Sequence, residues 1–163
     1  LGSTGRGVLE HFDVASPHII YMATLGKAAG VSGAFVAASA DVIETLIQGA
    51  RTYIYTTASP PMLSDTLLTS LDIIAHERER REILERLIVR LKAGVTGLRW
   101  KLMPSATAIQ PLLIGSNVEV INVAAALAER GVLVPAIRPP TVPPGSARLR
   151  ISVSAAHTGV DVS

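Results

Sequence analysis

The stretch Thr24–Gly33 reads "TLGKAAGVSG" and directly follows an apolar run, "HIIYMA" (His18–Ala23). Short apolar runs bounded by glycine and serine are typical of buried strands. Lys27 therefore stands at the end of a predicted strand, in a turn of glycines and small apolar residues. No carboxylate lies within ten residues of it on either side. Because a lysine is normally solvated and close to an acidic group, this position requires an explanation.

Three interpretations of Lys27 are open from the residues alone. The ordinary one is a surface lysine on a tight glycine turn. The second is phosphate binding, because glycine-rich turns after strands present backbone N–H groups to anions. The P-loop pattern GxxxxGK[ST] is not met, however, since Ala28 follows the lysine. The third is a Schiff-base lysine, whose amine must be poorly solvated and whose small neighbours would leave room for a flat cofactor.

Composition sets limits on the class of protein. The 163 residues are 48% apolar and 17% charged, which predicts a packed core and one domain or two small ones. A net charge of +2 is too small to argue for a nucleic-acid partner. The absence of cysteine excludes disulfides and thiolate metal sites. The run Ala28–Ala40 is too short and too rich in glycine and serine to span a bilayer, and we expect no membrane partner.

The first half alternates predicted strands and helices, which indicates an α/β fold. Asp41 is a candidate helix cap, and Ser59 is another, followed by prolines that are tolerated in a first turn. The predicted strands are His18–Ala23, Ala34–Ala38 and Thr52–Thr57, and the predicted helices run from Asp41 to about Gln48 and from Met62 through Ile74.

The charged run "HERERRE" (His76–Glu82) is taken as the domain boundary. It is typical of a solvated helix face with ion pairs, and it lacks the second histidine of the zinc motif HExxH, so we expect no metal. A helix with an apolar stripe follows and ends at about Gly94. Beyond it the patterns predict a compact α+β unit: strands at Ala108–Gly115, Val132–Ile137 and Ala147–Ser154, a helix opened by a Ser116/Glu119 capping box and ended by Gly131, and a proline-stiffened loop at Arg138–Ser146.

The lysine motif resembles that of the α-oxoamine synthases, the pyridoxal-phosphate (PLP) enzymes of aminotransferase class II that condense an amino acid with an acyl thioester. Their pattern is Thr-x-Gly-Lys, small residues and a Gly-x-Ser-Gly turn, matched here by Thr24, Gly26, Lys27, Gly30, Ser32 and Gly33. The resemblance continues through "YIYTTASPP" (Tyr53–Pro61) and "AIQPLLIG". It is most specific at "AIRPPTVPPGSARLRIS" (Ala136–Ser152).

The resemblance implies a two-part organisation. Residues 1–75 would be the C-terminal part of the large PLP-binding domain, with a mixed, mainly parallel sheet, and residues 76–163 a small α+β C-terminal domain, truncated at its end. Several of the family's cofactor contacts lie upstream of the lysine motif. We therefore expect a fragment of a longer cytoplasmic enzyme that works as a homodimer.

The resemblance also assigns roles to the site residues. Lys27 would bind PLP covalently and move the α-proton of the substrate, Thr24 would bond the PLP phosphate, and Thr57 would reach the phosphate of a partner subunit. Without the resemblance, Thr24 is equally well a strand-end residue bonded to backbone.

Two further residues would contact substrate. Arg150 would hold the carboxylate of the amino acid, which suits a guanidinium that grips a carboxylate with two parallel bonds. Arg148, on the same strand face, is the reserve for this role, and Thr141 would contact substrate from the proline-rich loop. Each also has an ordinary interpretation, as a surface arginine in an ion pair or a turn residue. Tyr55 lines an acyl entrance or packs in the core, and His157 is structural.

The implied reaction joins L-alanine to an acyl thioester with loss of carboxylate. One alternative is another family member that uses glycine or serine with a different acyl-CoA. A second, from a different class, is a non-catalytic fragment that retains only an interaction or dimerisation surface. The sequence gives neither the acyl carrier nor the acyl chain length.

Overall fold

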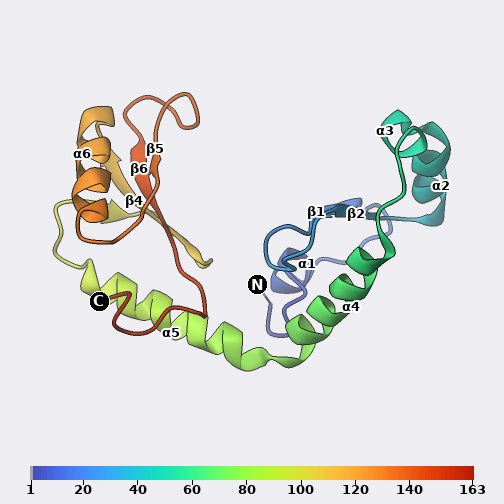
Figure 1. Ribbon diagram of the computed structural model, residues 1–163, viewed down its shortest axis with the longest axis horizontal. Helices are drawn as coiled ribbons and strands as arrows, with labels where there is room; N and C mark the ends of the chain where they lie inside the picture. Colours follow the sequence, from blue (N-terminus) through green and yellow to red (C-terminus); the bar gives the residue numbers. More distant parts are fainter. Residues whose placement is uncertain (1) are drawn as a thin grey trace. The chain divides into compact units, whose positions relative to one another are not determined.

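The structure is a computed structural model that describes residues 2–163 (Figure 1). The chain divides into two compact units, one ending at Arg78 and the other beginning at Glu79. The first unit contains α1 (Val8–His11), β1 (Tyr21–Thr24), β2 (Ala34–Ala37), α2 (Ala40–Gly49), α3 (Arg51–Ile54) and α4 (Pro61–His76). The second contains nearly all of α5 (Arg78–Gly94), then β3 (Lys101–Leu102), β4 (Ile109–Gly115), α6 (Asn117–Ala128), β5 (Ala136–Ile137) and β6 (Ala147–Ser152).

The lysine turn connects the two strands of the first unit. β1 and β2 pair antiparallel, with Tyr21 opposite Ala37 and Thr24 opposite Ala34. The rings of Tyr21 and Phe35 meet edge to face, with their centroids 5.5 Å apart. Both predicted strands therefore exist, although the first begins at Tyr21 rather than at His18.

The prediction that these strands are buried is wrong for this chain. Ile20 and Met22 are 61% and 62% exposed, and every residue of β2 is exposed. A two-stranded hairpin has no third strand or packed second layer to cover its faces, so its apolar side chains stay in solvent. Among the described residues of the first unit, only Val31 is a buried apolar side chain.

Three local predictions in the first unit need correction. The segment Thr52–Thr57 is not a strand: α3 forms there, with the amides of Tyr53 and Ile54 both donating to the carbonyl of Ala50. The aromatic and β-branched residues find no partner strand in the described chain, and the local helical bonds prevail. The predicted cap Asp41 is not the cap of α2: the helix begins after Ser39, and Asp41 lies in its first turn. The predicted cap Ser59 is not the cap of α4, because this helix begins after Pro60. A proline does stand in the first turn, as expected.

The second unit is a four-stranded sheet with the order β3-β4-β6-β5 and α6 in contact with β4, β5 and β6 (Figure 1). Its core is a cluster of four buried residues, Leu112, Val120, Ala147 and Leu149, with Trp100 and Leu102 among the half-buried residues packed against it. The α/β class is confirmed. All strand pairs between residues 2 and 163 are antiparallel, so the mainly parallel sheet expected for the large domain is not formed within this chain.

Strand β6 confirms the predicted alternation of its side chains. Ala147 and Leu149 are buried, whereas Arg148 is half-buried and Arg150 is exposed on the opposite face. The strand leads into a second small cluster, in which Val153 packs with Leu87 and Ile88 of α5. The predicted strand Val132–Ile137 is shorter than expected, because only its last two residues pair with β6.

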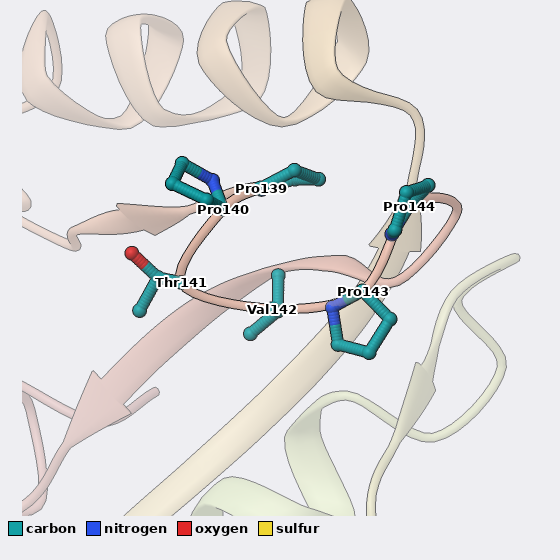
Figure 2. Close-up of a pocket in the computed structure, with 6 residues that line it drawn as sticks. All are labelled: Pro139, Pro140, Thr141, Val142, Pro143 and Pro144. Atoms are coloured by element: carbon teal, nitrogen blue, oxygen red, sulfur yellow. The ribbon is translucent and has the colours of Figure 1, made fainter.

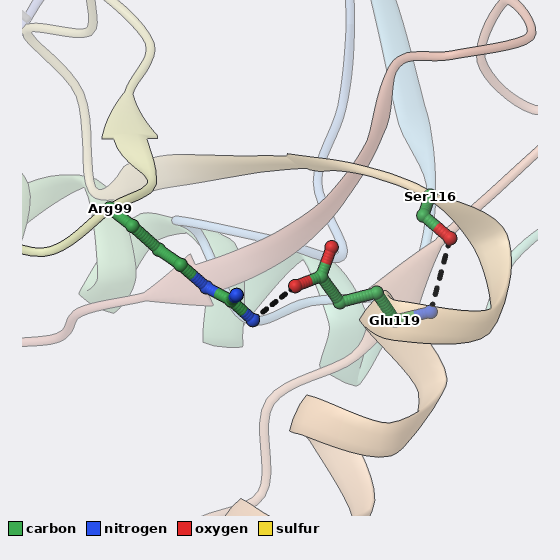
Figure 3. Close-up of polar contacts among 3 residues, drawn as sticks. All are labelled: Arg99, Ser116 and Glu119. Carbon is green, nitrogen blue, oxygen red and sulfur yellow. Dashed lines mark hydrogen bonds and ion pairs between the residues drawn. The ribbon is translucent and has the colours of Figure 1, made fainter.

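Helix α6 begins at the predicted cap (Figure 3). The Ser116 hydroxyl accepts a hydrogen bond of 3.3 Å from the backbone N–H of Glu119. The Glu119 carboxylate does not complete a reciprocal capping box; it pairs with the guanidinium of Arg99. The predicted helix start is therefore confirmed, with the acidic side chain used for an ion pair instead.

Helices α4 and α5 are separate, since Glu77 leaves helical geometry at φ −88° and ψ 67°. Within residues 2–163, no helix has both the length and the apolar content needed to cross a membrane.

Candidate active site

Lys27 and Thr24 lie together at the end of β1. Lys27 Nζ donates a 3.1 Å hydrogen bond to the Oγ1 of Thr24, which is the last residue of the strand. The turn is closed by backbone bonds, from Leu25 N to Gly33 O at 2.8 Å and from Val31 N to Leu25 O at 3.1 Å. A lysine amine and a threonine hydroxyl are thus held side by side on a defined loop.

Lys27 is exposed, and the turn leaves open space at Gly30. Gly30 and Gly33 adopt φ values of 65° and 126°, which other residues rarely adopt. A Cβ placed on Gly30 would meet no atom within 4 Å. Within the described chain, the Lys27 ammonium has no carboxylate partner. An exposed amine that bonds only a hydroxyl among the described residues, with space at Gly30, is compatible with a small anionic group that carries a reactive carbonyl.

Thr57 lies in the segment after α3, in the same unit as Lys27. Its side chain is exposed and has no partner among residues 2–163. Tyr55 is 76% exposed, with the Arg51 guanidinium 5.5 Å from the centre of its ring. Tyr55 therefore does not pack in a core within this chain.

The two arginines of β6 differ in what they contact. Arg148 Nε donates to the carbonyl oxygen of Ser146 at 3.0 Å, and its Nη1 lies 3.1 Å from the sulfur of Met103. Arg150 makes a backbone bond from its N–H to Pro135 O, and its exposed side chain contacts no acceptor in the described chain. Of the two, only Arg150 has its guanidinium available for an added carboxylate.

Thr141 lies in an open pocket formed by the proline-rich loop itself. The pocket has a volume of about 680 Å³ and is lined by Pro139, Pro140, Thr141, Val142, Pro143 and Pro144. Figure 2 shows the single hydroxyl of Thr141 among apolar side chains. Such a lining accepts hydrocarbon and offers one hydrogen-bonding group. Thr141 and Arg150 both belong to the second unit.

His157 takes part in a local turn. Its Nδ1 accepts a 3.0 Å hydrogen bond from the backbone N–H of Ser154, which agrees with a structural role. Residues 2–163 contain no group of three or more histidine, aspartate or glutamate side chains that could hold a metal ion.

Residues 3–163 match the family Aminotransferase class I and II. The chain belongs to this family. An 8-amino-7-oxononanoate synthase from Nitrosospira multiformis is 60% identical over 162 residues, which are 99% of this chain and 41% of the relative. The chain thus spans about two-fifths of the length of the curated relatives it matches.

Two solved enzyme structures are similar to this chain. An 8-amino-7-oxononanoate synthase from Francisella tularensis has a TM-score of 0.88 and 30% identity, covering 99% of this chain and 48% of that one. A serine palmitoyltransferase from S. paucimobilis, solved with a bound PLP–myriocin aldimine, has a TM-score of 0.89 and 27% identity, covering 99% of this chain and 41% of that one. The resemblance inferred from the lysine motif and the proline-rich loop is confirmed at the level of the family.

A carboxylate that the sequence analysis did not single out, that of Glu10, organises residues 3–6, the segment before α1. Glu10 Oε1 accepts bonds from Ser3 Oγ (2.9 Å) and Thr4 N (2.8 Å), and its Oε2 accepts from Thr4 Oγ1 (3.0 Å) and Arg6 N (3.0 Å). The bond from the Thr4 N–H, together with those from Arg6, Ser3 and the Thr4 hydroxyl, lowers the pKa of Glu10 from 4.5 to about 2. The cluster of serine, threonine and glycine upstream of one acidic residue was the available signal.

Gln110 is a second residue that the sequence did not single out. It is fully buried on β4, and its Nε2 donates to the carbonyl of Thr107 at 2.6 Å. Its Oε1 has no partner in the part of the chain that the structure describes. Its position between two apolar residues of the predicted strand gave no indication of burial.

Proposed function

We propose that this chain forms the C-terminal part of an enzyme that condenses L-alanine with a pimeloyl thioester, carried by CoA or a carrier protein, to give 8-amino-7-oxononanoate in biotin synthesis. CO₂ and the free thiol are the other products. The observation that carries this proposal is the 60% identity with the Nitrosospira multiformis synthase along 99% of the chain. Because the chain spans 41% of that relative, the activity is proposed for an enzyme that contains this chain and is as long as the relative, called here an enzyme of family length.

Lys27 is the residue that would hold pyridoxal phosphate, through its amine. Bound PLP supplies an electron sink for negative charge at the α-carbon of an amino acid. Thr24 would donate its hydroxyl to the PLP phosphate. The proposal is supported by the 3.1 Å contact between these two side chains and by the open space at Gly30.

Lys27 Nζ would also take the α-proton of alanine, because a lysine amine freed from other partners acts as a general base. Arg150 would grip the alanine carboxylate with its fork of N–H donors and keep its charge at any working pH. Thr141 would contact the acyl substrate from the apolar proline-rich pocket.

We further propose a cytoplasmic homodimer in which Thr57 serves the phosphate site of the partner subunit. An exposed threonine without partners in the described chain is consistent with this role. Dimer formation would also cover part of the apolar surface of the first unit, which includes Met22 and Tyr55.

The fold itself does not choose between alanine and serine as substrate. TM-scores of 0.88 and 0.89 for the Francisella synthase and the serine palmitoyltransferase are nearly equal. The two solved enzymes are also close in sequence identity to this chain, at 30% and 27%. The choice of substrate rests on the curated synthases, of which the Nitrosospira enzyme is 60% identical. We therefore assign alanine and a pimeloyl thioester.

The test uses an enzyme of family length that contains this chain. Borohydride reduction followed by peptide mass spectrometry should place PLP on Lys27, and Lys27→Ala should abolish the adduct while Lys101→Ala, at an exposed position on β3, retains it. Thiol release should require pimeloyl-CoA together with alanine, and glycine or serine should substitute poorly. An adduct at another lysine overturns the cofactor assignment, and preference for a different amino acid overturns the substrate assignment.

A further inference from the structure

The side chain of Arg148 connects the end of the proline-rich loop to Met103, the residue that follows β3. Its Nε donates to Ser146 O at 3.0 Å, at the end of the loop, and its Nη1 contacts Met103 Sδ at 3.1 Å. The guanidinium is half-buried and both contacts are made by the same planar group. Arg150, two residues further along the strand, has no comparable contacts in the described chain.

Ser146 in turn holds the second half of the loop. Its backbone N–H and its hydroxyl both donate to the carbonyl of Pro143, at 3.1 and 2.6 Å. At the start of the loop, Thr141 N donates to Arg138 O at 3.0 Å. Proline has no N–H, so a loop with four prolines between residues 138 and 146 can form few internal backbone bonds. Its shape therefore depends on the few bonds at its two ends.

Arg148 acts at both of these ends. Its backbone pairs with Ile137, directly before the loop, and its side chain holds Ser146, directly after it. The other anchor, Met103, is itself fixed to the sheet by a 2.8 Å bond from its N–H to Pro111 O. Because Arg148 and Lys101 both lie opposite Leu113, the arginine extends along one face of the sheet from β6 across β4.

We propose that Arg148 is a positioning residue that fixes the shape of the Pro139–Pro144 pocket and the place of Thr141 within it. This gives different roles to the two arginines of β6, of which the sequence analysis assigned the carboxylate to Arg150 and kept Arg148 in reserve: Arg148 holds the loop, and Arg150 is left to bind a carboxylate. The effect on catalysis rests on the proposed function, whereas the effect on the loop does not.

The loop effect is tested by NMR on the 163-residue chain. The parent should show order parameters of about 0.85 for the amides of Thr141 and Ser146, and Arg148→Met should lower them below about 0.6. Arg150→Met is the matched control and should leave both unchanged. Order parameters in folded Arg148→Met that equal those of the parent overturn the proposal.

A second variant keeps the test decisive if Arg148→Met does not fold. Met103→Leu removes the sulfur acceptor while keeping a similar apolar volume. The amide of Ser146 should then gain mobility, to a smaller extent than in Arg148→Met. Unchanged mobility at both Ser146 and Thr141 in Met103→Leu contradicts the assigned role.

The catalytic effect is tested in an enzyme of family length. Arg148→Met should raise KM for the acyl thioester about tenfold and leave the PLP adduct at Lys27 intact, because misplacement of a contacting group weakens binding without removing it. Arg150→Met should instead weaken binding of the amino acid. An unchanged KM in Arg148→Met overturns the catalytic effect. A parent enzyme without turnover overturns the proposed function, and the NMR test still decides whether Arg148 holds the loop.

Discussion

Lys27 Nζ and Thr24 Oγ1 lie 3.1 Å apart at the end of β1, three residues apart in the sequence. Thr24 is the last residue of the strand, and Lys27 lies in the glycine-rich turn that follows, where its amine contacts the threonine hydroxyl. A lysine amine and a threonine hydroxyl are thus presented from a single loop, as the proposed PLP site requires. This contact supports the proposed role of Lys27, whose side chain has no carboxylate partner among residues 2–163.

Thr24→Val should weaken PLP binding without removing the covalent attachment at Lys27. Loss of a hydrogen bond to a charged phosphate is worth about 1.5–3 kcal/mol, or roughly a tenfold to hundredfold rise in Kd. The measurement is a PLP titration followed by absorbance in an enzyme of family length. Thr45→Val is the control, because the Thr45 hydroxyl bonds only to Asp41 O within α2. Equal Kd values for the two variants would remove Thr24 from the phosphate site.

Ser116→Ala should destabilise the second unit by about 1 kcal/mol, the usual effect of losing an N-cap acceptor. The Ser116 hydroxyl accepts from Glu119 N at 3.3 Å, and alanine leaves that N–H without a side-chain partner. Urea unfolding followed by the fluorescence of Trp100, the single tryptophan, which packs against the core of this unit, measures the change. Ser116→Asp retains an acceptor and should match the parent; equal losses in both variants would show that the cap does not stabilise α6.

The sequence predicted the second unit better than the first, for a physical reason. Strands β4 and β6 and helix α6 bury their apolar faces against one another. The spacing of apolar residues and the capping residues therefore predict the elements that the structure forms. In the first unit the apolar runs have no covering layer among residues 2–78. There, "TYIYTT" has strand composition but finds no partner strand in the part of the chain that the structure describes, and local helical bonds decide the outcome.

In the candidate site, too, some features could be predicted from the sequence and others could not. The Lys27–Thr24 contact follows from spacing at a strand end and was open to prediction from sequence. The different environments of Arg148 and Arg150 were not, because both lie on one strand face and only the tertiary positions of Met103 and Ser146 distinguish them. The bonds to Glu10 were also missed, since they depend on a loop that folds back over α1.

Leu149→Ala should destabilise the second unit by about 2–5 kcal/mol, the range for removing a fully buried leucine and leaving a cavity. Leu149 is 1% exposed and lies in the cluster with Val120 and Leu112. Leu133→Ala is the matched control, because Leu133 is 89% exposed and its loss should change stability by less than about 0.5 kcal/mol. Similar urea midpoints for both variants would contradict the assignment of this core.

Glu10 should make the loop before α1, residues 3–6, sensitive to acid. Its folded pKa, at about 2, lies below the ordinary value of 4.5, because the Thr4 and Arg6 N–H groups and the Ser3 and Thr4 hydroxyls favour the ionised carboxylate. A lowered carboxyl pKa stabilises the folded state above the unfolded pKa, and this contribution is lost as the pH falls from about 4.5 to 2. The order of the loop should therefore be complete at neutral pH and decline through that window.

The carboxyl carbon of Glu10, followed by NMR during an acid titration, should show a midpoint near 2, and the amides of Thr4 and Arg6 should shift with it. Glu10→Gln keeps the shape of the side chain but removes the charge. In that variant the two amides should already resemble the acid form at neutral pH and should not follow the titration. A midpoint close to 4.5 in the parent, or amides in Glu10→Gln that match the neutral parent, would show that the carboxylate does not order this loop.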